Sequence, residues 1–310
     1  MSQPDLAIIL VSWNTRELLL ACLASLHASV GSLSYETIVV DNGSHDGSVE
    51  AVRTQFPHTR LIVNAHNPGF AGANNQGIQA SRGRYVLLLN SDTIAPPGSI
   101  ERLVRFADSQ PQAGLVGGLL LNPDSSFQYS FTAFPTLGSE LLSASGLGER
   151  LFHHGFPSYP ASQSRQTRQV EVIPGACMLA RRSAVEQVGL MDEAYFMYSE
   201  ETDWCWRMRR AGWEVWYVPA APIIHYGGQS TSQVRNPMVL ALYRSKVRFF
   251  RLHYGLVQAV LLCCALVLIL QLRWLVRGKI LGQDVGSIPG WQQLWDAPAT
   301  QTVRVQPRSL

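Results

Sequence analysis

Carboxylate side chains at two separate places in the sequence have a setting in which they could do chemistry. The first is Asp92, which ends the polar turn Asn90-Ser91-Asp92 directly after the apolar run Tyr85–Leu89. A continuous apolar run bounded by turn residues predicts a buried strand of a parallel sheet. A carboxylate just beyond such a strand can share a divalent cation with the phosphates of a bound nucleotide. Taken alone, an Asp in this position more often caps a turn.

The second place is the acidic segment Glu200-Glu201-Thr202-Asp203, which we predict to be helical up to a stop at Gly212. Glu200, Asp203 and Arg207 are three or four residues apart and share one face of this helix. Glu201 points about 100° away from Glu200. Exposed helices with ion pairs account for most such runs. For Asp203 and Arg207, an ion pair and a functional role are equally good interpretations.

An alternation of strands and helices must position these side chains. Strands are predicted at Leu6–Val11, Glu36–Val40, Arg60–Val63, Tyr85–Leu89, Gly114–Leu121, Val170–Ala180 and Glu214–Val218. Thr15 is the predicted N-cap of the first helix. The rhythm indicates an α/β fold with a mostly parallel sheet, flanked by helices through right-handed crossovers. The polar ends of the first four strands should then line one rim, namely Asn14, Asp41, the loop Gly69–Asn75 and Asp92.

The loops at this predicted rim suit a nucleotide without matching the common nucleotide-binding motifs. Glycines allow a ligand to approach the backbone, and helix N-termini favour phosphate. No GxGxxG sequence follows the first strand and no GK[ST] sequence occurs. A Rossmann dinucleotide fingerprint and a Walker A loop are therefore excluded.

Composition narrows the class of protein. The chain has 310 residues, 46% of them hydrophobic, which allows one large α/β domain or a domain with an appendage. Its formal net charge of +3 is too small to indicate nucleic acid as a partner. Five cysteines without CxxC spacing predict a reducing compartment and neither a zinc site nor a disulfide framework. No basic leader precedes the first strand, so we expect no signal peptide.

Four motifs, VSWN, VVDNGSHDGS, NPGFAGANN and LLLNSDT, occur in an order that resembles the nucleotide-sugar half of family 2 glycosyltransferases. Within that family the chain is most similar to bacterial rhamnosyltransferase-type enzymes, from about Ala7 to about Thr231. The resemblance implies the GT-A fold, with a mostly parallel, Rossmann-like sheet, and a contact between Asp41 and the base or ribose of the nucleotide. The nucleotide-sugar-binding residues that it implies are Ser12, Asn14, Asp41, Asn42, Asn67, Gly69, Phe70, Asn74, Asn90, Ser91 and Asp92.

The same resemblance implies a metal site. Asn90-Ser91-Asp92 occupies the place of the family's DxD motif, with Asn90 in place of the first acidic residue, so Asp92 is the expected ligand of Mg²⁺ or Mn²⁺. A lone histidine after an apolar strand is more often structural. The segment His225-Tyr226-Gly227-Gly228-Gln229-Ser230, however, resembles the family's His-x-Gly-Gly-x-Ser, whose histidine can complete the metal site. Ser230 or Thr231 would donate to the pyrophosphate.

The catalytic base is implied by FMYSEETDWCWR, which resembles the family's Glu-Asp-x-Asp motif followed by Arg. Its second acidic residue corresponds to Glu201, where Asp is usual, and the adjacent Glu200 is the alternative. A carboxylate within reach of an acceptor hydroxyl can remove its proton during attack on the anomeric carbon. One base with direct displacement implies inversion. Asp203 and Arg207 would support the acceptor or the helix.

The C-terminal part differs in composition, so we divide the chain into a GT-A domain, residues 1–235, and a helical extension, residues 236–310. Leu256–Leu272 barely reaches the length that spans a bilayer. We expect a helix that lies in or dips into the inner leaflet, with Arg and Lys drawn to anionic lipid. A buried core helix or a dimer contact is the alternative. Residues 282–310 show little periodicity and are expected to be disordered.

Residues 122–168 form an irregular stretch that is too long for an idle connection, so we expect it to face the acceptor. Its paired His153 and His154 are interpreted as solvated. The leading hypothesis is an inverting, metal-dependent glycosyltransferase at the cytoplasmic face of a bacterial inner membrane. dTDP-rhamnose is the favoured donor and a glycan or polyprenyl-linked sugar the acceptor, with the oligomeric state left open. A nucleotidyltransferase and a non-catalytic nucleotide-sugar-binding scaffold are the alternatives.

Overall fold

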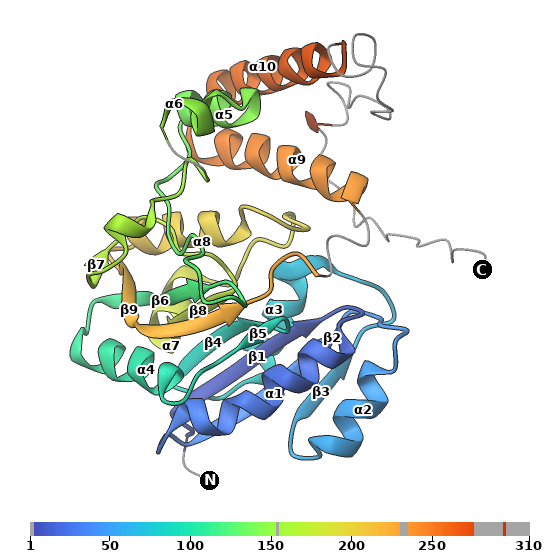
Figure 1. Ribbon diagram of the computed structural model, residues 1–310, viewed down its shortest axis with the longest axis vertical. Coiled ribbons are helices and arrows are strands. Elements are labelled where there is room, and N and C mark those ends of the chain that lie inside the picture. The colour runs from blue at the N-terminus through green and yellow to red at the C-terminus, as the bar shows by residue number, and fades with distance from the viewer. Residues whose placement is uncertain (1–2, 153–154, 230–234, 276–293, 296–310) are drawn as a thin grey trace.

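A twisted sheet with helices on both faces forms the lower half of the molecule, and a group of C-terminal helices covers one side of it (Figure 1). The computed structural model describes residues 3–152, 155–229, 235–275 and 294–295. Within this part of the chain, the sheet runs in the order β3-β2-β1-β4-β8-β6-β9-β5, with β7 paired to β9. The strands are β1 Leu6–Ser12, β2 Tyr35–Asp41, β3 Arg60–Val63, β4 Tyr85–Asn90, β5 Thr93–Ile94, β6 Ala113–Leu121, β7 Arg168–Gln169, β8 Cys177–Arg181 and β9 Glu214–His225.

The helices largely follow the apolar patterns of the sequence. They are α1 Arg16–Val30, α2 Ser48–Gln55, α3 Gly69–Ala80, α4 Ser99–Ser109, α5 Leu137–Ser145, α6 Leu147–Leu151, α7 Arg182–Val188, α8 Glu200–Arg210, α9 Arg235–His253 and α10 Leu256–Trp274, with a 3₁₀ turn at Ala161–Gln163. Thr15 is the N-cap residue of α1, as predicted, but its hydroxyl makes no capping hydrogen bond. It lies 3.0 Å from the hydroxyl of Ser91 instead.

Strand direction agrees with the sequence for the first half of the sheet and differs in the second. β3, β2, β1 and β4 are parallel neighbours, and β6 is parallel to β9. β8, however, lies antiparallel between β4 and β6. The predicted strand Val170–Ala180 is also too long, since only Cys177–Arg181 enters the sheet. Pro174 has no N–H to give to a ladder, and Val172 makes only an isolated bridge to Thr132.

β9 continues seven residues beyond the predicted end at Val218 and carries His225 at its last position. Pro219 and Pro222 favoured a strand end there, but the register of β9 against β6 shifts between Gly118 and Leu119. Prolines are tolerated at such an irregularity, where ladder hydrogen bonds are already interrupted. The extension carries His225 to the rim beside β5, where it pairs with Thr93.

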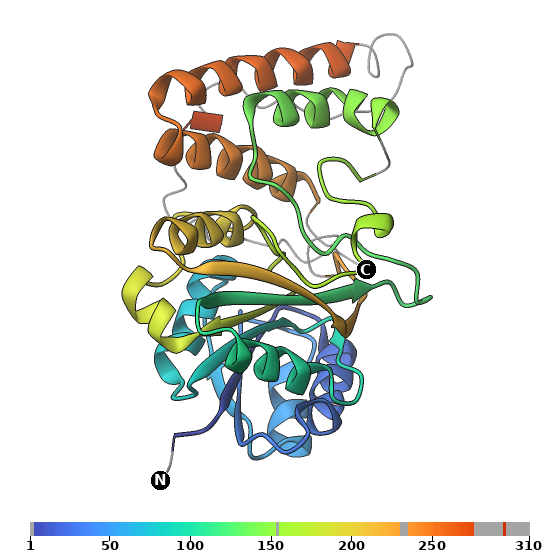
Figure 2. The same cartoon turned by 90° about the vertical axis from the view of Figure 1, so that its left-hand side faces the viewer.

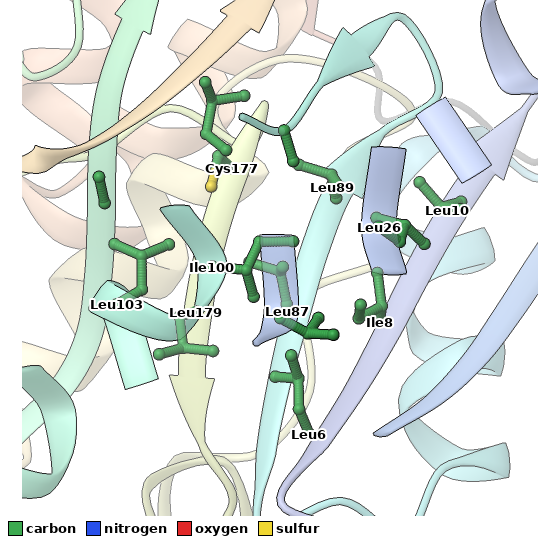
Figure 3. Close-up of a cluster of buried hydrophobic side chains, with 14 of the residues drawn as sticks. Leu6, Ile8, Leu10, Leu26, Leu87, Leu89, Ile100, Leu103, Cys177 and Leu179 are labelled. Carbon is green, nitrogen blue, oxygen red and sulfur yellow. The ribbon is translucent and has the colours of Figure 1, made fainter. Parts of the chain in front are cut away.

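Two apolar cores hold the sheet between its helices. On one face, Leu6, Ile8, Leu87 and Leu179 of the strands meet side chains of α1 and α4 (Figure 3). On the other face, α3, α7 and α8 pack on residues such as Ile9, Leu88 and Met178. Strands buried on both faces are expected to be apolar along their whole length, as β4 is.

A third core joins α9 and α10 to α5, above the α8 side of the sheet (Figures 1 and 2). α10 coincides with the predicted apolar segment and buries Ala259, Leu262, Cys263 and Leu266. Its other face is exposed, so the alternative of a buried helix holds for one side only. In the described part of the chain, no helix combines the length and apolarity needed to cross a membrane. The disorder expected for 282–310, and the two solvated histidines His153 and His154, lie outside the described residues apart from 294–295.

Candidate active site

Asp92 and His225 come together at the rim formed by β4, β5 and β9. The Nε2 atom of His225 lies 3.3 Å from Oδ1 of Asp92, and the Asp92 carboxylate is largely buried. Nδ2 of Asn90 lies 3.3 Å from the same ring nitrogen. Residues 133 positions apart in the sequence therefore present a carboxylate oxygen and an imidazole nitrogen to one point.

Gln128 fixes the orientation of this histidine. Its Oε1 accepts a hydrogen bond of 2.7 Å from Nδ1–H of His225, and its Nε2 donates to the carbonyl oxygen of His225 and to Oδ1 of Asn122. A proton on Nδ1 leaves the lone pair of Nε2 facing Asp92, which is the tautomer that a metal ligand needs. Gln128 was not predicted, because it lies in no periodic pattern of the sequence. The stretch that contains it, expected to be irregular, also includes the helices α5 and α6.

The donor set of this pair fits a divalent cation bound together with a substrate. Among the residues that the structure describes, no three or more His, Cys, Asp and Glu side chains are arranged so that they alone could hold a metal ion. A cation here would have Asp92 and His225 as its protein ligands, and the remaining positions would be left to phosphate oxygens and water. Mg²⁺ is usually held in this way, by one or two protein groups plus substrate phosphates.

Asp41 offers one unused oxygen at the end of β2, which β1 separates from β4. It ends β2, where it pairs with Ser12 of β1. Oδ1 of Asp41 accepts hydrogen bonds from the backbone N–H groups of Gly43 and Ser44. Oδ2 is buried and has no hydrogen-bond partner among the described residues. A buried carboxylate oxygen is costly to leave unpaired, so this acceptor suits a donor group of a ligand.

Most of the polar side chains at the predicted nucleotide site hydrogen-bond within the protein. Asn42 donates to Asn67 Oδ1 and Gly69 O, and Asn67 Oδ1 also accepts from the N–H of Gly69. Asn74 donates to Phe70 O. These bonds join the loop after β2 to the loop that opens α3.

The loop after β1 is held in the same way. Oδ1 of Asn14 accepts from the N–H of His45, so the loops after β1 and β2 are joined. Asn14 itself adopts a left-handed backbone conformation, with φ of 51°. The hydroxyls of Ser12, Thr15 and Ser91 form a buried chain, with spacings of 3.3 and 3.0 Å. The predicted residues thus lie together at the rim and give it its shape.

Glu200 and Glu201 begin α8 after a sharp turn. Tyr198 and Ser199 both have left-handed φ values, 70° and 66°, which non-glycine residues rarely adopt. Strain of this kind persists where the surrounding structure fixes it, and it clusters at functional sites. The preceding carbonyl of Phe196 accepts a hydrogen bond of 2.9 Å from the N–H of Phe70. The turn that precedes Glu200 and Glu201 therefore contacts the loop that opens α3 directly.

The two glutamates differ in accessibility. Glu200 is buried, and its Oε2 has no hydrogen-bond partner among the described residues. Burial, followed by the charge of Glu201, raises the pKa of Glu200 well above its usual value. Glu201 is partly exposed, and burial also raises its pKa. Of the two glutamates, Glu201 is the one that keeps some contact with solvent.

Backbone contacts connect Glu201 to the Asp92 rim. The N–H of Asn90 donates to the carbonyl of Ala176 at 3.0 Å. A methyl group added at the neighbouring Gly175 would lie 4.0 Å from Cβ of Glu201 and 3.0 Å from the ring of Phe70. Glu201 is therefore beside the carboxyl end of β4, on the same side of the molecule as Asp92.

Asp203 and Arg207 form the expected ion pair, with Nε of Arg207 2.7 Å from Oδ2 of Asp203. Arg207 also donates to the carbonyls of Val188 and Leu190, and Oδ1 of Asp203 lies 2.7 Å from Nε2 of His253 on α9. Burial alone would raise the pKa of Asp203, but the hydrogen bond from His253 and the charge of Arg207 outweigh it and lower this pKa. The pair therefore holds α8 in place, and the sequence analysis missed its partner His253.

Taken together, a mixed sheet flanked by helices and a polar rim at the carboxyl ends of its parallel strands are the setting in which α/β enzymes bind their ligands. The chain belongs to glycosyltransferase family 2, whose model, described as glycosyl transferase family 2, matches residues 7–189. The alternative of a nucleotidyltransferase is thereby wrong.

Relatives of known function support the same family. The chain is 30% identical to N-acetylglucosaminyl-diphospho-decaprenol L-rhamnosyltransferase of Mycobacterium tuberculosis, over 89% of this chain and 90% of the relative. It is also 30% identical to the rhamnosyltransferase WbbL of Escherichia coli K12, over 46% of this chain and 52% of the relative. The resemblance to rhamnosyltransferase-type enzymes is confirmed.

Solved structures confirm the GT-A fold. The mannosyltransferase PcManGT of Pyrobaculum calidifontis, in complex with GDP-Man and Mn²⁺, superposes with a TM-score of 0.55 at 15% identity, covering 93% of this chain and 78% of that one. GalNAc-T7 with UDP, GalNAc and Mn²⁺ gives a TM-score of 0.55 at 13% identity, over 81% of this chain and 48% of that one.

Proposed function

We propose that this glycosyltransferase inverts the anomeric centre as it moves rhamnose from a nucleoside diphosphate, with dTDP-rhamnose as the favoured donor, to a hydroxyl of a polyprenyl-diphosphate-linked sugar. The observation that carries the proposal is the position of Glu201, a partly exposed carboxylate beside the rim that holds Asp92 and His225. The two related rhamnosyltransferases support the sugar, and the decaprenol-linked substrate in the name of one supports the acceptor.

In this proposal Glu201 is the general base. The acceptor hydroxyl transfers its proton to the Glu201 carboxylate while its oxygen attacks the anomeric carbon, and the bond to the diphosphate oxygen breaks. The raised pKa of Glu201 makes it a stronger base than an ordinary glutamate. Attack and departure in a single displacement invert the configuration.

The leaving diphosphate is assigned to the rim. A divalent cation, Mg²⁺ or Mn²⁺, held by Asp92 and His225 would neutralise the charge that develops on the leaving group. Gln128 keeps the imidazole in the tautomer that this requires. The unpaired Oδ2 of Asp41 would accept from the base or the ribose. The expected donors Ser230 and Thr231 lie outside the described residues.

We also propose that the enzyme works at the surface of the inner membrane, on its cytoplasmic side. α10 exposes Val257, Leu261, Leu268 and Leu272, which recur at helical spacing along one stripe. An apolar stripe on a surface helix suits insertion among lipid headgroups and upper acyl chains. A lipid-linked acceptor would be presented at this surface.

The substitution Glu201→Gln tests the proposal. We expect transfer to fall by about 10²–10⁴-fold, the usual contribution of a general base. dTDP-rhamnose with Mg²⁺ should still raise the melting temperature of the variant, because binding to the native state does not need the base. Glu200→Gln is the matched control and should retain transfer. Loss of transfer in Glu200→Gln with activity kept in Glu201→Gln would move the base by one residue. Transfer unaffected by either change would assign the base to another residue, and absence of transfer in the wild type would favour a non-catalytic scaffold.

A further inference from the structure

A cavity of about 340 Å³ lies below α5 and α6, outside the nucleotide rim. Phe134, Phe152, Phe156 and Tyr159 line it, together with prolines and a few side chains that carry hydroxyl or amide groups. Phe152 and Phe156 stack, with their ring centroids 5.1 Å apart. A cavity of this size, with aromatic and other apolar side chains and a few polar groups in its walls, is typical of a site for a small molecule. The proposed mechanism leaves this cavity without a role.

Two arginines lie beside the aromatic walls of this cavity. The guanidinium of Arg168 is 5.9 Å from the ring centroid of Tyr159, and that of Arg209 is 5.9 Å from the centroid of Phe134. Arg168 has no carboxylate within 4 Å among the described residues, whereas Arg209 has a long contact of 3.9 Å with Glu171. Exposed guanidinium groups bind phosphate oxygens in a bidentate way. An apolar cavity next to two arginines matches a molecule that has an apolar chain and a diphosphate.

The cavity also connects to the catalytic helix. The ring of Phe134 packs against Trp206 of α8, with centroids 4.8 Å apart, and its N–H donates to Oε2 of Glu171. From Glu171 the chain runs to Gly175, which lies beside Glu201. Residues 171–175 therefore link the wall of the cavity to the neighbourhood of the proposed base.

Exposed apolar side chains continue from the mouth of the cavity onto the surface. Phe152 lines the cavity and is 61% exposed, and Leu147 and Leu151 of α6 are exposed next to it in the chain. α6 follows α5, and α5 lies against α10, whose outer stripe is also apolar (Figures 1 and 2). The apolar tail of a ligand that extends out of the cavity would therefore meet an apolar surface of the protein.

We propose that the cavity binds the first isoprenyl units of a prenyl diphosphate, with Arg168 and Arg209 on its phosphates. This inference rests on the proposed function, because it assigns a place to the lipid part of that acceptor. The cavity takes the branched chain nearest the diphosphate and the rest of the chain stays in the bilayer. The acceptor sugar then points along Glu171–Gly175 to Glu201. The segment 122–168 thus contributes the acceptor site through its aromatic residues.

Farnesyl diphosphate is a probe that needs no transfer reaction. Its binding is measured by titration calorimetry on the full chain, with dTDP and Mg²⁺ present to fill the donor site. We expect farnesyl diphosphate to bind at least tenfold more tightly than either farnesol or inorganic diphosphate, since each lacks half of the recognised chemistry. If inorganic diphosphate binds as tightly as farnesyl diphosphate, the cavity does not bind the isoprenyl chain.

Two independent variants test the two halves of the site. Ser158→Trp places a large ring in the cavity and should weaken the binding of farnesyl diphosphate at least tenfold. The double substitution Arg168→Ala and Arg209→Ala removes the proposed phosphate contacts and should weaken binding by a similar factor. Arg53→Ala, which removes an exposed arginine of α2 at the other end of the molecule, is the matched control. If dTDP-rhamnose raises the melting temperature of each variant as much as that of the wild type, the variant is folded.

The outcomes separate this inference from the proposed function. If farnesyl diphosphate binds as expected but no prenyl-linked sugar accepts rhamnose, the cavity assignment stands and the proposed function fails. If transfer proceeds and both variants keep the wild-type KM for a prenyl-linked acceptor, the cavity assignment is wrong and the proposed function stands.

Discussion

His253 of α9 and Asp203 of α8 lie within hydrogen-bond distance, with 2.7 Å between Nε2 and Oδ1. Asp203 is two residues after the proposed base Glu201. α9 also contacts the preceding turn, because Ser245 donates to the carbonyl of Met197 and Arg248 pairs with Asp192. α9 therefore holds the segment that carries the proposed base, Glu201, and is part of the structure that positions the candidate active site.

Replacing His253 by Ala should weaken both stability and transfer. Hydrogen bonds to charged groups contribute about 1.5–3 kcal/mol, and the loss leaves Oδ1 of the buried Asp203 without this partner. We expect a lower melting temperature and a lower kcat, with the KM for the donor little changed. His253→Gln, whose amide can still donate, should recover part of kcat. Equal kcat in the wild type and His253→Ala would contradict a positioning role.

The charge of buried Glu200 should make stability fall as pH rises. Burial and the neighbouring Glu201 raise the pKa of Glu200 in the folded state. Between the ordinary pKa of a glutamate and this raised value, the folded state binds more protons than the unfolded state, so the free energy of unfolding decreases with pH. Glu200→Gln removes this loss. In thermal unfolding, the variant should gain stability over wild type at pH 8 and lose that gain near pH 4.

A melting temperature of Glu200→Gln that is below wild type at pH 8 would show that the carboxylate has a partner in the folded protein. Ala substitution of Glu50, an exposed residue of α2, is the control for the loss of a glutamate side chain.

Gln128 should set metal affinity although it is not itself a ligand. Partners that orient a metal-binding histidine typically change affinity or activity by about 10–100-fold when they are removed. For Gln128→Ala we expect the Mn²⁺ concentration at half-maximal transfer to rise by this factor, with kcat at saturating Mn²⁺ nearly kept. Gln128→Glu, which still accepts from Nδ1, should stay close to wild type. EDTA should abolish transfer in all three proteins, and full activity in EDTA would refute the metal site.

Local patterns predicted the rim because the informative residues follow apolar runs. Asp41, Asp92 and the loop at Gly69 end or follow strands whose apolar character is continuous, so both the strands and their polar ends are visible in the sequence. The parallel half of the sheet follows from the same alternation. The extent of β9 was hidden by Pro219 and Pro222, which normally end a strand.

Long-range partners could not be predicted in the same way. β8 is antiparallel to β4 and β6, and its apolar sequence carries no information on strand direction. Gln128 and His253 matter through contacts with residues 97 and 50 positions away, and neither belongs to a periodic pattern that marks it. The aromatic cavity likewise joins side chains between Ala133 and Ser139 to Phe152 and to side chains between Phe156 and Gln163, and these meet only in the folded chain.

Gly69 lies where the loop that opens α3 contacts the segment before Glu200, so a methyl group added there should disturb both. Its φ is 84°, and a β-carbon there would lie 2.2 Å from the carbonyl oxygen of Phe196. Left-handed backbone costs a non-glycine residue about 1–2 kcal/mol, and the clash with backbone cannot be relieved by a rotamer change. Gly69→Ala should therefore lower the melting temperature and raise the KM for the donor sugar. Gly138→Ala, where α5 leaves open space around the added carbon, should keep both at or above wild type, and an equal loss in the two variants would contradict the contact with Phe196.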